Sequence, residues 1–323
     1  MFDKCASVAN MMNEAGKKRI PFLFGMNYEL TEGFFVAEPK KQTDILFQIN
    51  GVSNFKRESK NTTNYSFDIH PIGIDKYRNK FDSALKSMTT MGVDLINLTV
   101  KTPISTSLSL HEILKYSNAK YCIMVPERFV CFSPEIFVRT MGNKILSYPM
   151  KGTIDANISN AESIILNNKK EIEEHKIAIK LIEDDISKIA SNVTTTRFRY
   201  VEKIENNKGA LLQVSSEVQG VLPSDFWDNI GTYIMKLLPA GSISGHPKAD
   251  AMDIIRSTEN EDRGFYTGIV GYFDGENIDC GVLIRYIEQD GVNLFFRSGG
   301  GVTLDSDCES EYSEVLKKVY LPF

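Results

Sequence analysis

The segment LLPAGSISGHPKADAMDIIRS, residues 237–257, begins the part of the chain that decides the fold and the site. RGFYTGIVGYF (residues 263–273) and RSGGGVTLDSDCESEYSE (residues 297–314) follow it. Glycines are dense in all three segments, and bare backbone N–H groups in such runs can approach a small anion with no Cβ in the way. A single glycine more often belongs to a turn or a bulge. Together these glycines predict the floor of a binding site for an anionic ligand.

Charged side chains accompany the glycines. Four cations occur at intervals around them: Lys248, Arg263, Arg285 and Lys318. Glu311 and Glu314 lie three residues apart at the start of the last predicted helix. Cations, bare amides and paired carboxylates in one segment predict an enzyme that holds a carboxylate substrate partly through a metal ion. The segment contains neither the G-x-x-x-x-G-K-S/T phosphate loop nor a dinucleotide-binding glycine motif.

The composition restricts the class of protein. The 323 residues carry a formal charge of −5 with a pI near 5.6, which argues against nucleic acid or an anionic membrane as the main partner. Five cysteines without C-x-x-C spacing indicate reduced thiols, and four scattered histidines argue against a zinc site. Because no apolar run approaches 18 residues and the N-terminus lacks a signal-peptide pattern, we expect a soluble, untargeted, cytoplasmic protein.

Hydrophobic spacing predicts a mixture of helices and strands. Helices are expected at residues 5–19, 75–91, 109–116, 160–192 and 223–237. The fourth is the clearest, because isoleucines recur in it at spacings of three, four and seven. The intervening segments alternate apolar and polar residues as strands do, starting with a meander near the N-terminus. Without a composition break, long linker or internal repeat, the sequence predicts one α+β domain over residues 1–323.

Two pairs of glutamates share the same spacing on different predicted helices. Glu171 and Glu174 lie three residues apart on one edge of the 160–192 stripe, as Glu311 and Glu314 do near the C-terminus. A solvated rim is the ordinary interpretation of such residues. If the fold brings all four together, their mutual repulsion requires a divalent cation among them.

These motifs resemble those of the chorismate-utilising enzymes, which include anthranilate synthase component I, aminodeoxychorismate synthase component I and isochorismate synthase. The three quoted segments match in order, and weaker similarity at Asn97, at SPE (residues 133–135) and around Glu174 extends over most of the chain. The resemblance implies two large, mostly antiparallel sheets packed together, with helices outside and the site between them. It also implies an N-terminal region shorter than in typical relatives.

Lys151 decides which reaction the resemblance implies. It follows an apolar strand and precedes Gly152, so we expect it at a strand-to-loop junction, where an exposed loop lysine is the plain alternative. The motif PMKGT (residues 149–153) resembles the P-I-K-G-T of aminodeoxychorismate synthases, whereas the other two enzymes carry alanine. A lysine facing a closed site can lose its proton and act as a nucleophile. The implied reaction converts chorismate and ammonia to 4-amino-4-deoxychorismate, a precursor of p-aminobenzoate and folate, through a covalent lysine adduct.

The resemblance also implies roles for other residues. Glu135 would be the general acid that protonates the departing hydroxyl. Mg²⁺ would be held, directly or through water, by Glu171, Glu174, Glu311 and Glu314. The implied substrate contacts are Ser244, Lys248, Tyr266, Arg285, the amides of Gly299, Gly300 and Gly301, and Lys318. A separate glutamine amidotransferase subunit would supply the ammonia.

Three departures from the family pattern bear on the reaction. Gln213 replaces a histidine associated with pyruvate elimination, which fits an enzyme that keeps the enolpyruvyl group. Leu95 stands where isochorismate-forming relatives place a lysine, which argues against water as the nucleophile. In IKLIEDD (residues 179–185), Lys180 and Glu183 reverse the charges of the related motif. Two alternatives stay open: anthranilate synthase component I, and a catalytically silent chorismate-binding protein.

Overall fold

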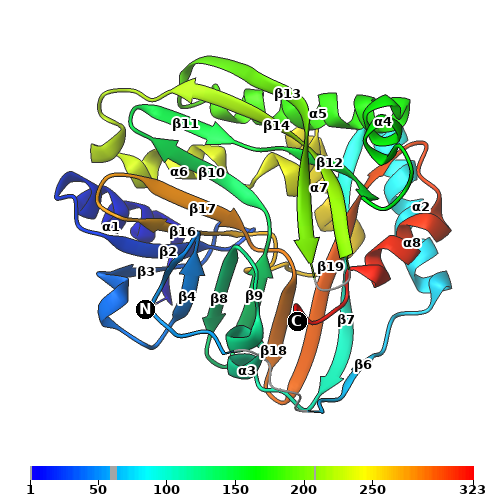
Figure 1. Ribbon diagram of the computed structural model, residues 1–323, viewed down its shortest axis with the longest axis horizontal. Coiled ribbons are helices and arrows are strands. Elements are labelled where there is room, and N and C mark those ends of the chain that lie inside the picture. The colour runs from blue at the N-terminus through cyan, green and yellow to red at the C-terminus, as the bar shows by residue number, and fades with distance from the viewer. Residues whose placement is uncertain (1, 59–63, 207–208) are drawn as a thin grey trace.

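The computed structural model describes residues 2–58, 64–206 and 209–323 of the chain. Within these residues the backbone forms a ten-stranded and a nine-stranded sheet, and the paired strands are antiparallel, which confirms the predicted α+β class (Figure 1). The first sheet contains β1 (Phe2–Asp3), β2 (Phe22–Met26), β3 (Gly33–Ala37), β10 (Ile136–Met141), β11 (Lys144–Ser147), β12 (Met150–Asp155), β13 (Ser191–Asn206), β14 (Gly209–Val221), β16 (Ile269–Phe273) and β17 (Ile278–Val282). The second contains β4 (Leu46–Ile49), β5 (Val52–Ser53), β6 (Phe67–Ile69), β7 (Leu95–Thr106), β8 (Tyr121–Val125), β9 (Phe129–Ser133), β15 (Gly245–His246), β18 (Tyr286–Asp290) and β19 (Asn293–Thr303).

Four of the six predicted helices are confirmed, and they include the last one, which contains Glu311 and Glu314 (Cys308–Lys317). The helices and 3₁₀ turns are α1 (Cys5–Lys17), η1 (Pro39–Lys41), α2 (Ile74–Met91), α3 (Leu110–Tyr116), α4 (Ala161–Asn167), α5 (Lys169–Ile186), η2 (Phe226–Asp228), α6 (Ile230–Leu237), η3 (Gly241–Ile243), α7 (Lys248–Glu259) and α8 (Cys308–Lys317). The helices predicted at 5–19, 75–91 and 109–116 are confirmed as α1, α2 and α3. Gly92 ends α2 with φ 68°, a left-handed conformation that suits glycine. None of the described helices combines the length and apolar character needed to cross a bilayer.

Two of the predicted helices are wrong in extent. The region 160–192 is two helices and the start of a strand, because Asn168 has an extended backbone and its side chain accepts a hydrogen bond from the Glu171 N–H, which begins α5. Ser191 already belongs to β13. Of residues 223–237 only α6 is α-helical, and a 3₁₀ turn precedes it.

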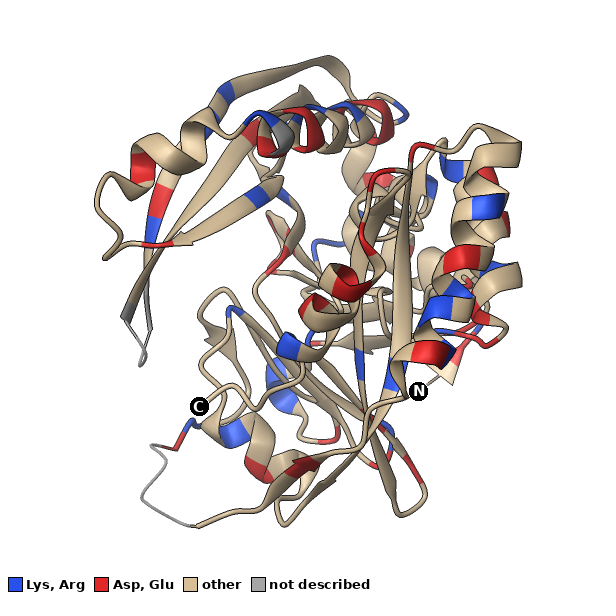
Figure 2. Ribbon diagram, turned by 90° about the vertical axis from the view of Figure 1, so that its right-hand side faces the viewer, with Lys and Arg blue, Asp and Glu red and all other residues tan. Residues whose placement is uncertain are grey.

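Basic and acidic residues alternate along the ribbon of α5 (Figure 2). Lys180 pairs with Asp184 at 2.7 Å, and Glu183 accepts a hydrogen bond from Thr195 at 2.8 Å. The two reversed charges of IKLIEDD therefore each have their own partner. The isoleucine stripe faces inward, with Ile179 and Ile186 buried.

The two sheets pack through a layer of aromatic and aliphatic side chains. Buried residues of both sheets meet there, and the rings of Phe47 and Tyr272 lie 5.7 Å apart across the layer. Helices cover the outer faces. The helices α1 and α6 pack on the ten-stranded sheet, while α2, α7 and α8 pack on β7 and β19 (Figure 1). Burial of apolar area from both sides of each sheet stabilises this layered arrangement.

A buried ion pair joins several of these elements. The Arg263 and Glu259 side chains are each 1% exposed, and their closest nitrogen and oxygen atoms are 2.6 Å apart. Arg263 also donates to the carbonyls of Ile243 at 2.9 Å and Asn97 at 2.6 Å, and Glu259 accepts from the Thr99 N–H at 2.8 Å. The pair thus connects α7 to β7 and to η3.

Replacing Glu259 by glutamine leaves the Arg263 charge buried without its counter-ion. Loss of one partner of a buried ion pair costs about 3–5 kcal/mol, so we expect Glu259→Gln to lower the free energy of unfolding by that amount in urea denaturation. The control is Asp253→Asn in the same helix, because its ion pair with Arg256 is exposed (64% and 77%) and such pairs often contribute nothing measurable. Equal stability changes in the two variants would contradict the assignment.

Candidate active site

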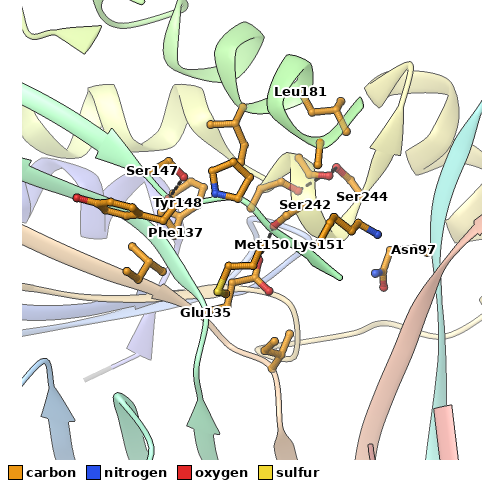
Figure 3. Close-up of a pocket in the computed structure, with 18 of the residues that line it drawn as sticks. Asn97, Glu135, Phe137, Ser147, Tyr148, Met150, Lys151, Leu181, Ser242 and Ser244 are labelled. Atoms are coloured by element: carbon orange, nitrogen blue, oxygen red, sulfur yellow. Dashed lines mark hydrogen bonds between the residues drawn. The ribbon is translucent and has the colours of Figure 1, made fainter. Parts of the chain in front are cut away.

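A cavity of about 360 Å³ is lined by residues of both sheets, of α5 and of the loops around η3 and after α8 (Figure 3). Its wall includes these predicted site residues: Glu135, Lys151, Ser244, Arg285, Gly300, Gly301, Glu314 and Lys318. Segments that are far apart in the sequence therefore meet at one cavity. A cavity of this size and mixed lining suits a small polar ligand.

A β-bulge aims Lys151 into the cavity. Strand β12 pairs with β14 so that Met150 faces Ser215 and Thr153 faces Gln213, which leaves one extra residue in β12. Gly152 occupies the bulge with φ 88°. Lys151 therefore lies within a strand rather than at its junction with a loop. Its Nζ is 3.7 Å from Glu174 Oε2, and its side chain extends toward Asn97 (Figure 3).

The glycine run forms an open edge of β19. Pairing with β18 ends at Arg297, so the following residues have only β7 beside them. The Thr99 N–H donates to the Glu259 carboxylate at 2.8 Å, and the Asn97 N–H donates to the Ser244 carbonyl at 2.8 Å. Thr99 lies opposite Gly299 and Asn97 lies opposite Gly301 in the pairing of β7 with β19. Because the N–H groups of Thr99 and Asn97 point away from β19, these two pairs exchange no hydrogen bonds. The amides of these glycines point to the free edge.

The glycines also keep the two faces of β19 open. A Cβ on Gly300 would lie 3.2 Å from Glu311 Oε2 and 3.9 Å from Glu314 Oε1. On the opposite face, a Cβ on Gly301 would lie 3.6 Å from Lys151 Nζ. Because neither residue has a side chain, the strand leaves room for the carboxylates of α8 on one face and for the Lys151 amine on the other.

The Glu135 carboxyl lies in the cavity wall near three cations. Ser242 Oγ donates to Glu135 Oε1 at 2.7 Å (Figure 3). Burial raises the pKa of Glu135, and the Ser242 hydrogen bond and the charges of Arg285, Lys151 and Lys318 oppose that effect without cancelling it. The carboxyl is therefore protonated at higher pH than an ordinary glutamate, as suits a proton donor.

Lys318 organises the other side of the cavity. Its Nζ lies 2.7 Å from Glu314 Oε1 and donates to the Gly299 carbonyl at 2.8 Å. Burial acts to raise the pKa of Glu314, but the charge and hydrogen bond of Lys318 outweigh it, so the pKa is lowered. The surroundings thus favour the ionised form of Glu314 and the protonated form of Glu135.

The four predicted metal-binding glutamates come from α5 and α8. Glu171 Oε2 would lie 3.2 Å from a Cβ on Gly152, beside the Lys151 bulge, and Glu174 faces Lys151 itself. Across the described residues, acidic, histidine and cysteine side chains form no group of three or more that could hold a metal ion as placed. Oxygen donors approaching from two helices fit Mg²⁺ in kind, because Mg²⁺ keeps several waters and accepts carboxylates through them.

Lys248 and Tyr266 lie behind the cavity wall. Lys248 Nζ donates to both oxygens of Asp185, at 2.9 and 3.1 Å, and to the Leu237 carbonyl at 3.2 Å. Tyr266 is 3% exposed and packs on Tyr286 with ring centroids 5.8 Å apart. In this structure both residues support the wall, and neither is part of its lining.

Sequence reasoning missed three residues of the site: Ser242, Asp185 and His175. Ser242 lies between two glycines of the first quoted segment, and that position was a usable signal. Asp185 pairs with the neighbouring Lys188 but also with Lys248, and the partner of His175, Ser216, is likewise distant in the sequence. His175 is fully buried, and its Nε2 lies 2.7 Å from Ser216 Oγ. Burial, with the nearby charge of Arg199, lowers the pKa of His175 to about 4.

Replacing Ser242 by alanine should raise the pKa of Glu135 further. The Ser242 hydrogen bond stabilises the ionised carboxylate, so its loss favours the protonated form. The measurement is an NMR titration of ¹³C-labelled glutamate side chains. Ser244→Ala is the control, because that hydroxyl donates to the Ala240 carbonyl and should leave the titration unchanged. A lower pKa in Ser242→Ala would refute the assignment.

Known proteins resemble the chain in sequence and in fold. A PabA-like protein of Pasteurella multocida, itself uncharacterised, is 42% identical, covering 96% of each chain. Aminodeoxychorismate synthase component 1 of Bacillus subtilis is 29% identical over 82% of this chain and 58% of its own length. The menaquinone-specific isochorismate synthase of Escherichia coli has the same fold, with a TM-score of 0.74, 14% identity and coverage of 98% of this chain and 82% of its own.

The family follows from the length of chain that is matched. The model of the chorismate binding enzymes matches residues 29–322, a range that includes every element lining the cavity. The predicted resemblance is confirmed, and the chain belongs to the family of chorismate binding enzymes.

Proposed function

We propose that the chain is component I of aminodeoxychorismate synthase, which forms 4-amino-4-deoxychorismate from chorismate and ammonia. The observation that supports this most is the bulge in β12, which aims the Lys151 amine into the cavity that also contains the Glu135 carboxyl. An amine at this place supplies a nucleophile that alanine could not. Similarity to the Bacillus subtilis aminodeoxychorismate synthase component 1 gives further support.

The first half of the proposed reaction attaches the ring to the enzyme. The neutral Lys151 amine forms a bond to ring carbon C2, both ring double bonds shift by one position, and the C4–O bond breaks. Glu135 gives its proton to the departing hydroxyl, which leaves as water. The raised pKa of Glu135, caused by burial, keeps that proton available. The product of this half is a secondary ammonium adduct of Lys151 and a Glu135 carboxylate.

The second half releases the product. Ammonia bonds to C4, both ring double bonds shift back, and the C2–N bond breaks, so Lys151 leaves as a neutral amine. A proton from the new C4 ammonium group returns to the Glu135 carboxylate. The sum is chorismate plus ammonia giving aminodeoxychorismate plus water. A glutamine amidotransferase subunit would supply the ammonia in the cell, for the synthesis of p-aminobenzoate and folate.

The cavity wall offers groups for the substrate carboxylates. Arg285 donates through Nε to the Tyr320 hydroxyl at 3.2 Å, which leaves its two terminal nitrogens directed elsewhere and able to grip a carboxylate. The amides of Gly299 and Gly301 point to the same open edge. Glu171, Glu174, Glu311 and Glu314 would hold Mg²⁺, which would supply positive charge to the ring carboxylate.

Replacing Lys151 by alanine should abolish amination. The assay contains the pure protein, chorismate, Mg²⁺ and an ammonium salt, with product identified by mass spectrometry. Wild type should form aminodeoxychorismate and, without ammonium, carry a covalent increment of chorismate less water on Lys151. Lys176→Ala is the control, since that lysine is exposed and pairs only with Glu173 on the outside of α5.

Three outcomes would reject the proposal. Normal amination by the Lys151→Ala variant would show that Lys151 is not the nucleophile. Anthranilate or isochorismate as the wild-type product would assign a different reaction. Calorimetric binding of chorismate with no turnover at any ammonium concentration would indicate a silent binding protein.

Replacing Glu135 by glutamine should lower kcat by about 10²–10⁴-fold, because the general acid is lost while the shape of the side chain is kept. Since an acid works only while protonated, wild-type kcat should fall as pH rises through the raised pKa of Glu135. Ser242→Ala should move that fall to higher pH. A pH profile unaffected by both substitutions would show that the acid is another group.

A further inference from the structure

The turn η3, which carries Ser242, is held to the body of the protein from two sides. On one side, Arg263 donates to the Ile243 carbonyl at 2.9 Å, and the Asn97 N–H donates to the Ser244 carbonyl at 2.8 Å. These contacts fix the end of the turn to β7 and to the buried ion pair. Ser242 itself is exposed in the cavity wall, so packing does not hold its side chain in place. The position of its hydroxyl therefore depends on how the beginning of the turn is held.

Asp185, in the last turn of α5, holds the beginning of η3. The residue is 7% exposed, and its Oδ2 accepts both the Gly241 N–H and Lys248 Nζ, each at 3.1 Å. Its Oδ1 accepts from Lys248 at 2.9 Å and from Lys188 at 2.6 Å. Among the described residues, this carboxylate is the one acceptor of the Gly241 N–H. Because protein donors occupy both of its oxygens, Asp185 acts on the turn rather than on the contents of the cavity.

The contact between α5 and η3 requires a glycine at position 241. A Cβ on Gly241 would lie 2.9 Å from Asp185 Oδ2, which is closer than a carbon and an oxygen can approach without one of them moving. The carboxylate is held in place from its other side by Lys248. A side chain at position 241 would therefore push the beginning of the turn away from α5, whereas glycine lets the backbone come close.

The residue after Gly241 is the one that bonds to the proposed acid. Ser242 Oγ donates to Glu135 Oε1 at 2.7 Å (Figure 3). Such a bond weakens steeply once its atoms leave the range of about 2.5–3.0 Å, so a small displacement of the turn is enough to break it. We propose that Asp185 is a positioning residue, which fixes the beginning of η3 to α5 and so places the Ser242 hydroxyl against the Glu135 carboxyl. This inference rests on the proposed role of Glu135 as the proton donor.

Two substitutions of Asp185 separate its hydrogen bond from its charge. Both Asp185→Asn and Asp185→Ala remove the negative charge, but only asparagine keeps an oxygen at the place of Oδ2, where it can accept from Gly241. We expect the pKa of Glu135 to be higher in Asp185→Ala than in Asp185→Asn, because loss of the Ser242 hydrogen bond favours the protonated carboxyl. In a Ser242→Ala background the two variants should titrate alike. The measurement is an NMR titration of ¹³C-labelled glutamate side chains.

Gly241→Ala disturbs the same contact without changing any charge, and it decides the question if Asp185→Ala fails to fold. We expect it to raise the pKa of Glu135 as Ser242→Ala does, and the double variant to show no further rise. Lys188→Ala is the control, because Lys188 is 44% exposed and its removal leaves the other bonds of Asp185 intact. This control should titrate as wild type does.

Three results would overturn the proposal: an equal pKa of Glu135 in Asp185→Ala and Asp185→Asn, a wild-type pKa in Gly241→Ala, or shifts of Gly241→Ala and Ser242→Ala that add. The cations that act on Glu135, namely Arg285, Lys151 and Lys318, are the same in every variant, so they do not cause the differences. If the titrations follow our expectation while wild type forms no aminodeoxychorismate, the positioning role stands and the proposed reaction fails.

Discussion

The floor of the cavity depends on one buried charge. Arg263 is almost fully enclosed, so its guanidinium must find partners inside the protein, and it does so with Glu259 and with the carbonyls of Asn97 and Ile243. These partners belong to a helix, a strand and a 3₁₀ turn, which the guanidinium joins at this point. Because Glu259 accepts the Thr99 N–H, that donor is withdrawn from the sheet ladder. The adjacent glycine amides are consequently directed to the open edge of β19.

The surroundings shift the pKa values of two carboxyl groups of the same cavity in opposite directions. Burial dominates at Glu135 and favours the protonated form, whereas contact with Lys318 dominates at Glu314 and favours the charge. A proton donor and an anion are thus available within one small space at the same pH. The glycine strand leaves room beside these groups, because Gly300 and Gly301 have no side chains on the faces that carry the α8 carboxylates and Lys151.

Sequence patterns were sufficient for the fold class and for eight residues of the cavity wall, and they failed where tertiary contacts determine the local structure. The alternation of strands and the motif order carried the fold class and eight wall residues. The break at Asn168 was invisible because Ile165 and Ile172 keep the helical spacing across it. Lys248 carries a site-like motif, yet Asp185, 63 residues away, takes up its charge. The bulge at Lys151 could not be read from β12 alone, because it exists only in the register with β14.

That bulge has a wider consequence for how this sheet carries a reactive group. A regular strand offers a side chain two directions only, toward one face or the other, and the choice is tied to every second neighbour. One extra residue in β12 interrupts this alternation, so the orientation of Lys151 is independent of the inside–outside pattern of the rest of the strand. The residues on either side of the bulge can therefore keep the alternation that packing requires, while the Lys151 amine points into the cavity.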